Sequence, residues 1–141
     1  MAVVAYTRGL EALLKGDVKI SAVTVKALLW RSGYVPSKND HAFRSAVNAE
    51  VPAGAGYTAG GANAPTTVVL DATNSRVELR LGAASWLVPA GATLLARGLS
   101  WYVSLGAAGS DILLAYNDFV TDRSATNQSF NVAAGVVRLQ N

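Results

Sequence analysis

The hydrophobic pattern of the chain changes once, early in the sequence. Over residues 6–15 the apolar side chains recur every three or four positions, which is typical of one face of an amphipathic helix. Gly16 follows, where such a helix can end in a left-handed turn. From residue 18 onward, β-branched and apolar residues occur in short runs instead, most clearly over residues 23–30. The pattern predicts one short helix over residues 6–15, followed by strands.

Alternation of apolar and polar residues predicts the strands of the second half of the chain. Residues 76–81 alternate most regularly, so their apolar side chains are expected to face a core and their charged side chains the solvent. Further strands are predicted over residues 66–71, 86–88, 93–105, 112–119 and 129–139. Trp101 and Tyr102 point to opposite faces of one predicted strand, so one of them is expected to lie outside the core between the sheets. A second short helix is predicted near residues 42–47.

These elements together predict the fold class. About seven or eight short strands are joined by stretches too short for crossover helices, which favours antiparallel sheets. We expect a mainly β protein, with one antiparallel β-sandwich domain over residues 1–141 and jelly-roll or Greek-key connections. Residues 51–65 contain four glycines and two prolines, which exclude a regular element. This segment is predicted to be a long Gly/Ala-rich loop or an extended arm.

Composition limits the partners that the chain can have. Twelve Lys and Arg against nine Asp and Glu give a net charge of +3, but the basic residues are spread singly and form no stripe that could follow a nucleic-acid backbone. No apolar run reaches the ~18 residues of a membrane-spanning helix. We therefore expect neither nucleic acid nor a membrane as a partner. Only 15% of the residues are charged, which indicates that another protein covers part of the surface.

No motif indicates an enzyme. The chain has no Cys, which excludes thiol catalysis, disulfides and Cys-ligated metals, and nothing points to an oxidising compartment. His41 is the single histidine, and no Gly-x-Ser-x-Gly motif accompanies it. The glycines of residues 54–61 lack the Gly-Lys-Ser/Thr ending of a phosphate-binding loop. We expect no catalytic residue, no metal and no cofactor. A small hydrolase using His41 or Asp118 is an alternative without a motif to support it.

Several motifs follow one another along residues 8–81. They are Leu10-x-x-Leu13-Leu14-x-Gly16, the strand 25–29, Ser32-Gly33-Tyr34-Val35-Pro36, Asp40-His41-Ala42-Phe43 and Gly56-Tyr57-Thr58-Ala59-Gly60-Gly61. In this series the chain resembles a family of small virion structural proteins of tailed bacteriophages. The resemblance implies a β-rich, non-enzymatic particle component, located in the virion and assembled in many copies in the host cytoplasm. It implies no catalytic residues.

The sequence and the resemblance together predict a capsid decoration or cement protein, which binds the outer shell and stabilises contacts between capsomers. The alternative is a tail-associated or fibre-associated adaptor or receptor-binding module, and only in that case is carbohydrate expected as a ligand. The expected partners are the major capsid protein or another virion protein, and further copies of the chain. The residues predicted to contact a partner are Tyr34, Gly54, Gly56, Tyr57, Gly60, Gly61, Trp86, Val136, Val137 and Leu139.

Overall fold

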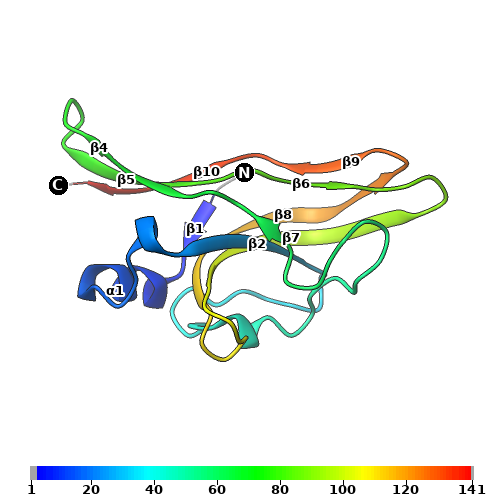
Figure 1. Ribbon diagram of the computed structural model, residues 1–141, viewed down its shortest axis with the longest axis horizontal. Coiled ribbons are helices and arrows are strands. Elements are labelled where there is room, and N and C mark those ends of the chain that lie inside the picture. The colour runs from blue at the N-terminus through cyan, green and yellow to red at the C-terminus, as the bar shows by residue number, and fades with distance from the viewer. Residues whose placement is uncertain (1–2, 141) are drawn as a thin grey trace.

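Strands form 49% of the chain and lie in two facing layers of antiparallel sheet (Figure 1). The computed structural model describes residues 3–140. The elements are β1 (Val3–Ala5), α1 (Thr7–Lys15), a 3-10 turn (Ile20–Ala22), β2 (Thr24–Trp30), a second 3-10 turn (Arg44–Ala46), β3 (Ala62–Asn63), β4 (Thr67–Asp71), β5 (Arg76–Leu81), β6 (Ala84–Leu87), β7 (Thr93–Ser104), β8 (Ile112–Thr126), β9 (Ser129–Val132) and β10 (Gly135–Gln140). The predicted mainly β class with antiparallel sheets is confirmed. The jelly-roll or Greek-key topology is not confirmed.

The lower layer in Figure 1 is a five-stranded sheet in the order β1-β8-β7-β2-β3. Most residues of β2 and of the second half of β7 are buried, whichever face of the sheet they point to. Both faces of this sheet are therefore covered. This is why residues 24–30 appear in the sequence as an almost continuous apolar run and not as an alternating one.

The upper layer consists of a three-stranded sheet, β10-β5-β4, and the pair β6-β9. The two pieces share one register, since Leu81 lies opposite Gly135 and, three residues further on, Ala84 lies opposite Val132. Between them, the backbone of residue 65 passes so close to Gly82 that a Cβ at position 82 would overlap its carbonyl oxygen. The Gly82 carbonyl oxygen also accepts a hydrogen bond of 2.9 Å from the Trp101 indole N–H, which ties the upper layer to the lower one.

Two hydrophobic cores lie on opposite faces of the five-stranded sheet. The main core fills the space between the layers and includes Trp101, which is 0% exposed. The second core lies between the sheet and the segment 31–61 below it (Figure 1), and consists of Tyr6, Leu28, Trp30, Tyr34, Tyr102 and Leu113. Trp101 and Tyr102 thus point to opposite faces, as predicted. Both are buried because the segment 31–61 covers the second face.

A chain of hydrogen bonds runs through the second core and ends at His41. The indole N–H of Trp30 donates to the Ser100 hydroxyl oxygen at 3.1 Å, and this hydroxyl lies 2.9 Å from that of Tyr6. The Tyr6 and Tyr34 hydroxyl oxygens are 3.0 Å apart, and that of Tyr34 lies 2.9 Å from His41 Nδ1. When every proton points toward His41, each hydroxyl donates one bond and accepts one. In this arrangement His41 serves as the acceptor that ends a buried network.

The short elements are predicted less accurately than the strands. Helix α1 begins one residue later than expected and ends at Gly16, whose φ of 78° is the left-handed turn that the sequence indicates. The predicted helix over residues 42–47 is wrong, since only the single 3-10 turn Arg44–Ala46 forms there. This turn follows from long-range pairing, because the Arg44 backbone N–H donates to the Asp111 carbonyl oxygen and Ser45 donates to that of Ala108.

The buried tyrosines should make the stability of the folded protein fall in alkali above a defined pH. Burial raises the pKa of Tyr102 to about 12 and raises the pKa values of Tyr6 and Tyr57 further. The unfolded chain ionises its tyrosines near pH 10, so this stabilisation is complete below about pH 10 and is lost as the pH rises through the folded values.

In a spectrophotometric titration we expect at most Tyr34 and Tyr116, whose pKa values burial also raises, to ionise before the protein unfolds. The other three tyrosines should ionise in one step that coincides with loss of the circular dichroism signal. Normal titration of all five near pH 10 in the folded state would contradict the described packing.

Candidate interaction surface

The glycine-rich segment 51–65 is tied to the sheet and is not an arm. The Tyr57 side chain is 3% exposed, and its hydroxyl donates to Glu50 Oε2 at 2.6 Å while accepting the Leu29 backbone N–H at 3.1 Å. The same carboxylate oxygen accepts the Gly60 backbone N–H at 2.6 Å, and the Tyr102 hydroxyl donates to the Gly60 carbonyl oxygen at 2.6 Å. The prediction of an extended arm is therefore wrong, because these bonds hold the segment against β2 and β7.

The glycines of this segment permit close backbone contacts. At Gly61, with φ of +82°, a Cβ would overlap the Ala27 carbonyl oxygen of β2, and at Gly56 a Cβ would overlap the carbonyl oxygen of Leu87. Gly60 is buried, Gly61 is half-buried, and Gly54 and Gly56 are exposed. Of these four glycines, only Gly54 has no atom within 4 Å of its Cβ position. The segment as a whole holds the fold together.

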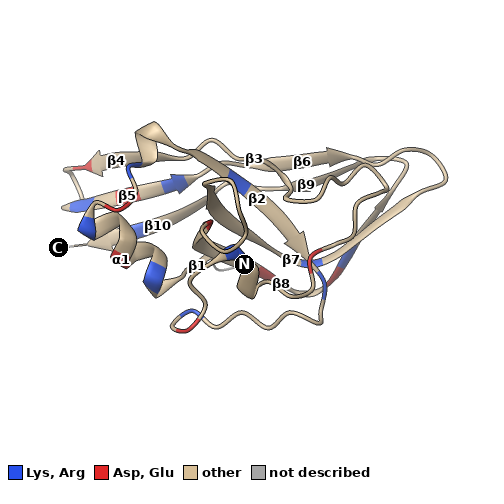
Figure 2. Cartoon of the chain, turned by 60° about the horizontal axis from the view of Figure 1, so that its bottom comes forward, with Lys and Arg blue, Asp and Glu red and all other residues tan. Residues whose placement is uncertain are grey.

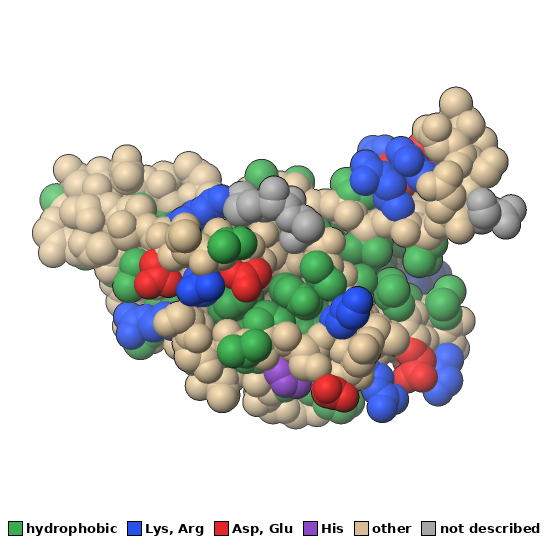
Figure 3. Space-filling model, turned by 180° about the vertical axis from the view of Figure 1, so that it is seen from behind, with side chains coloured by type: hydrophobic (Ala, Val, Ile, Leu, Met, Phe, Trp, Pro, Cys, Tyr) green, Lys and Arg blue, Asp and Glu red, His purple; other side chains and the backbone are tan. Residues whose placement is uncertain are grey.

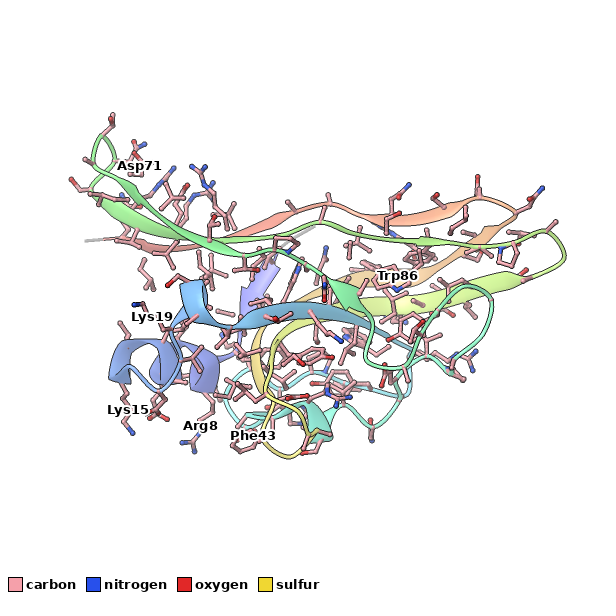
Figure 4. The ribbon with its side chains drawn as sticks, viewed as in Figure 1. Arg8, Lys15, Lys19, Phe43, Asp71 and Trp86 are labelled. Atoms are coloured by element: carbon pink, nitrogen blue, oxygen red, sulfur yellow. The ribbon has the colours of Figure 1, made fainter. Side chains whose placement is uncertain are left out.

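The two aromatic residues predicted as contacts, Tyr34 and Trp86, are also buried. Tyr34 is 3% exposed and meets the Trp30 ring edge-on at 5.2 Å between ring centroids. Trp86 lies between the layers (Figure 4), 5% exposed, with ring centroids of Tyr57 and Phe130 at 5.7 and 6.3 Å. The prediction that Tyr34, Tyr57 and Trp86 form an exposed contact surface is wrong, because packing inside the fold takes up their rings.

The last strand, in contrast, does border an open apolar surface. In β10, Val137 and Leu139 point to the inner face of the upper layer and Val136 to its outer face. Helix α1 lies under this end of the sheet (Figure 1). Between the helix and the sheet is a groove of about 240 Å³. We call it the α1 groove. Every residue that lines it is aliphatic: Leu10, Leu13, Leu14, Val18, Ile20, Val68, Val77, Leu79, Val137 and Leu139.

The rim of the α1 groove exposes large apolar side chains to water. Leu14 on α1 is 76% exposed, and Val68 and Leu70 on β4 are 56% and 73% exposed. Leu139 on β10 is 41% exposed. Figure 3 shows hydrophobic side chains in the hollow beneath the overhanging end of the sheet. A continuous patch of this kind on a small protein marks a contact site.

The outer face of the same sheet is held by a cluster of charges centred on Glu78. Its carboxylate, expected to face solvent, is 4% exposed because three arginines cover it. The shortest N–O distances are 3.2 Å to Arg76, 3.0 Å to Arg80 and 3.1 Å to Arg138. Hydrogen bonds from Arg80 and then Arg138 lower the pKa of Glu78. The cluster links β5 to β10 and, because Arg76 also pairs with Asp71 at 3.0 Å, to β4 (Figure 2).

Two larger hollows are open and more polar. One, of about 630 Å³, lies where β1, β8 and β9 meet and includes Asn117, Arg123 and Asn131. The other, of about 420 Å³, lies between α1 and residues 40–43 and includes Arg8, with Phe43 at its edge (Figure 4). Within residues 3–140, no three acidic or histidine side chains lie close enough to hold a metal ion. Neither hollow combines a nucleophile, a base and an orienting group.

The described residues contain no helix of the length and hydropathy that a bilayer crossing requires. Comparison of the chain with protein-family models, with curated proteins and with solved structures gave no match. The α1 groove and its rim are therefore interpreted from their own geometry.

The contact residues predicted from the sequence include Val137 and Leu139, which line the groove, but none of the other residues that line it. Val68 and Leu70 lie two positions apart in the predicted strand and so share one face, and this spacing could have indicated a second apolar face. Leu14 follows Leu13 directly, so it lies beside the buried stripe of the helix. The role of Glu50 could not be recognised in the sequence. Its partners Tyr57 and Gly60 lie in the glycine-rich segment, and only the fold shows that they bond to this carboxylate.

Proposed function

We propose that this protein is an adhesive structural subunit of a tailed-phage virion, most consistent with a capsid decoration protein that binds the outer shell. The observation that supports this best is the α1 groove, an aliphatic surface with Leu14, 76% exposed, on one side and Val68, 56% exposed, on the other. Such a surface binds through shape and burial of apolar area. Repeated over a symmetric shell, contacts of modest area add up to stable attachment.

The alternative of a tail or fibre module that binds carbohydrate has lost its structural support. It depends on aromatic rings that stack on sugars, and the rings proposed for this, those of Tyr34, Tyr57 and Trp86, are 5% exposed or less. Attachment to the tail through protein contacts stays a prediction. The copy number on particles distinguishes it from attachment to the capsid.

The proposal is tested by replacing Leu14 with lysine. Leu14→Lys places a charge on the rim of the α1 groove without disturbing the core, since this side chain is 76% exposed. When the purified protein is added to particles that lack it, we expect at least a tenfold loss of bound protein at equal concentration.

The matched control is Leu87→Lys, because Leu87 is 75% exposed and lies on β6, outside the lining of the groove. This variant should bind particles like the unmodified chain. Equal binding by both variants would show that the α1 groove is not the contact surface. Failure of the unmodified protein to bind particles would contradict the proposed function itself.

A further inference from the structure

The edge of the upper sheet is open at β4. This strand pairs with β5 on one side, and among the described residues no strand pairs with its other side. Its sequence, Thr67-Val68-Val69-Leu70-Asp71, contains neither Lys nor Pro, the residues that commonly prevent an edge strand from pairing with another chain. The backbone groups of the free edge are therefore available to a further strand.

The inner face of this edge strand is apolar and incompletely covered. Val68 lines the α1 groove, and Leu70, on the same face of β4, lies at its rim; they are 56% and 73% exposed. The outer face carries Thr67, Val69 and Asp71, which lie opposite Arg80, Glu78 and Arg76 of β5. An added strand with one apolar and one polar face would match both sides of β4.

We infer that this strand is the β4 of a second copy of the chain, paired antiparallel about a two-fold axis at Val69. The two upper layers then form one six-stranded sheet, in the order β10-β5-β4 followed by β4-β5-β10 of the second copy. The α1 grooves of both copies lie on the same side of it. This inference rests on the proposed function, in which the chain acts by contact, and it names the partner of this part of the surface.

The side chains of β4 favour that register. Two-fold pairing at Val69 is the only register that pairs all five residues of the strand while keeping each face continuous. On the inner face, Val68 then lies opposite Leu70 of the second copy, and the symmetry repeats this apolar pair. Pairing at Asp71 would instead set two carboxylates side by side, which is unfavourable.

Charges on the outer face complement each other in the same register. Asp71 of the second copy lies opposite Thr67 of β4. Thr67 in turn pairs with Arg80 of β5, so Asp71 and Arg80 lie in the same row, on either side of Thr67. Arg80 is 54% exposed at its side chain, so it can reach across. The Asp71 carboxylate is thus placed between its own Arg76 and the arginine of the other copy.

Cysteine cross-linking tests the register directly, because the chain has no Cys of its own. Residues opposite each other in antiparallel strands have Cα atoms roughly 4.5–5.5 Å apart, which suits a disulfide. Val69→Cys should form a disulfide-linked dimer under mild oxidation at least ten times faster than Leu87→Cys, a control at a more exposed position in the same layer. Equal rates for the two variants would overturn the inference.

Sedimentation equilibrium gives a second test that needs no cross-link. With rising concentration, the mass of the unmodified protein should increase from 14.6 kDa toward twice that value. Leu70→Lys should weaken this association at least tenfold, and Leu87→Lys should not change it. Unchanged thermal unfolding of both variants confirms that they fold.

The possible outcomes separate this inference from the proposed function. If the unmodified protein is a monomer at all concentrations, the inference is overturned. If, in that case, Leu70→Lys also loses particle binding, the β4 edge binds a protein of the particle and not a second copy. A dimer that does not bind particles supports the inference and contradicts the proposed function.

Discussion

Replacing Gly61 with alanine is expected to lower the free energy of unfolding by roughly 2–5 kcal/mol. Two effects combine at this position. The φ of +82° is strained for any residue with a Cβ, and the Cβ would overlap the Ala27 carbonyl oxygen of β2. The backbone of residue 61 or of β2 must therefore move, which disturbs the burial of Leu28 next to it. Urea unfolding followed by tryptophan fluorescence measures the change.

Gly91→Ala separates the two effects. Gly91 has nearly the same φ, +78°, but has nothing within 4 Å of its Cβ position. Its substitution should cost only the conformational strain, about 1 kcal/mol. If Gly61→Ala is no more destabilising than Gly91→Ala, the close approach of the segment 51–65 to β2 is absent in solution.

Removing the Glu50 carboxylate is the second change with a large expected effect. Glu50→Ala deletes the acceptor of both the Tyr57 hydroxyl and the Gly60 backbone N–H, each at 2.6 Å. Hydrogen bonds to a charged group are worth roughly 1.5–3 kcal/mol each, and the partial exposure of this side chain reduces the sum to about 2–4 kcal/mol. The loss is measured as a shift of the urea midpoint at unchanged slope.

Glu11→Ala is the control, because the Glu11 side chain is 49% exposed and pairs with the exposed Arg8 at 3.5 Å. Its removal should change the free energy of unfolding by no more than about 0.5 kcal/mol. A further variant, Glu50→Gln, retains an acceptor oxygen and should lose about half as much stability as Glu50→Ala. Equal stability of Glu50→Ala and Glu11→Ala would mean that the glycine-rich segment is not held by this carboxylate.

Local patterns predicted the elements that depend on local information. The helix ends at Gly16 as predicted, because a left-handed turn there is a property of the residue itself. The strands β2, β5 and β7 lie where β-branched and alternating residues indicate them, whereas β8 begins at the predicted residue but continues to Thr126, seven residues beyond the predicted end. In these cases the side chains that determine the structure are neighbours in the sequence.

The second core and the attachment of the glycine-rich segment could not be predicted in the same way. Tyr34 bonds to Tyr6, which is 28 positions away, and Tyr57 bonds to Leu29 at the same separation. Neither partner is visible in the short windows where periodicity is measured. Glycines in such a segment also fit two opposite interpretations, a free loop or a close contact between backbones, and only the fold distinguishes them.

The same reasoning explains the outcome for the predicted contact residues. The motif Gly56-Tyr57-Thr58-Ala59-Gly60-Gly61 and the residues Tyr34 and His41 stand out in the sequence, and the structure uses them to attach the segment 31–61 to the sheet. The exposed apolar residues Leu14, Val68 and Leu70 belong to ordinary-looking elements. A contact surface made of aliphatic side chains has no motif, so it emerges only when the fold places those elements side by side.

The central claim is that this chain acts by covering a particle in many copies, and the number of chains per purified virion tests it most directly. Quantitative mass spectrometry of the particles, referenced to the major capsid protein, should give on the order of hundreds of copies, as repetition over a symmetric shell requires. A few copies per particle, or none, would contradict it.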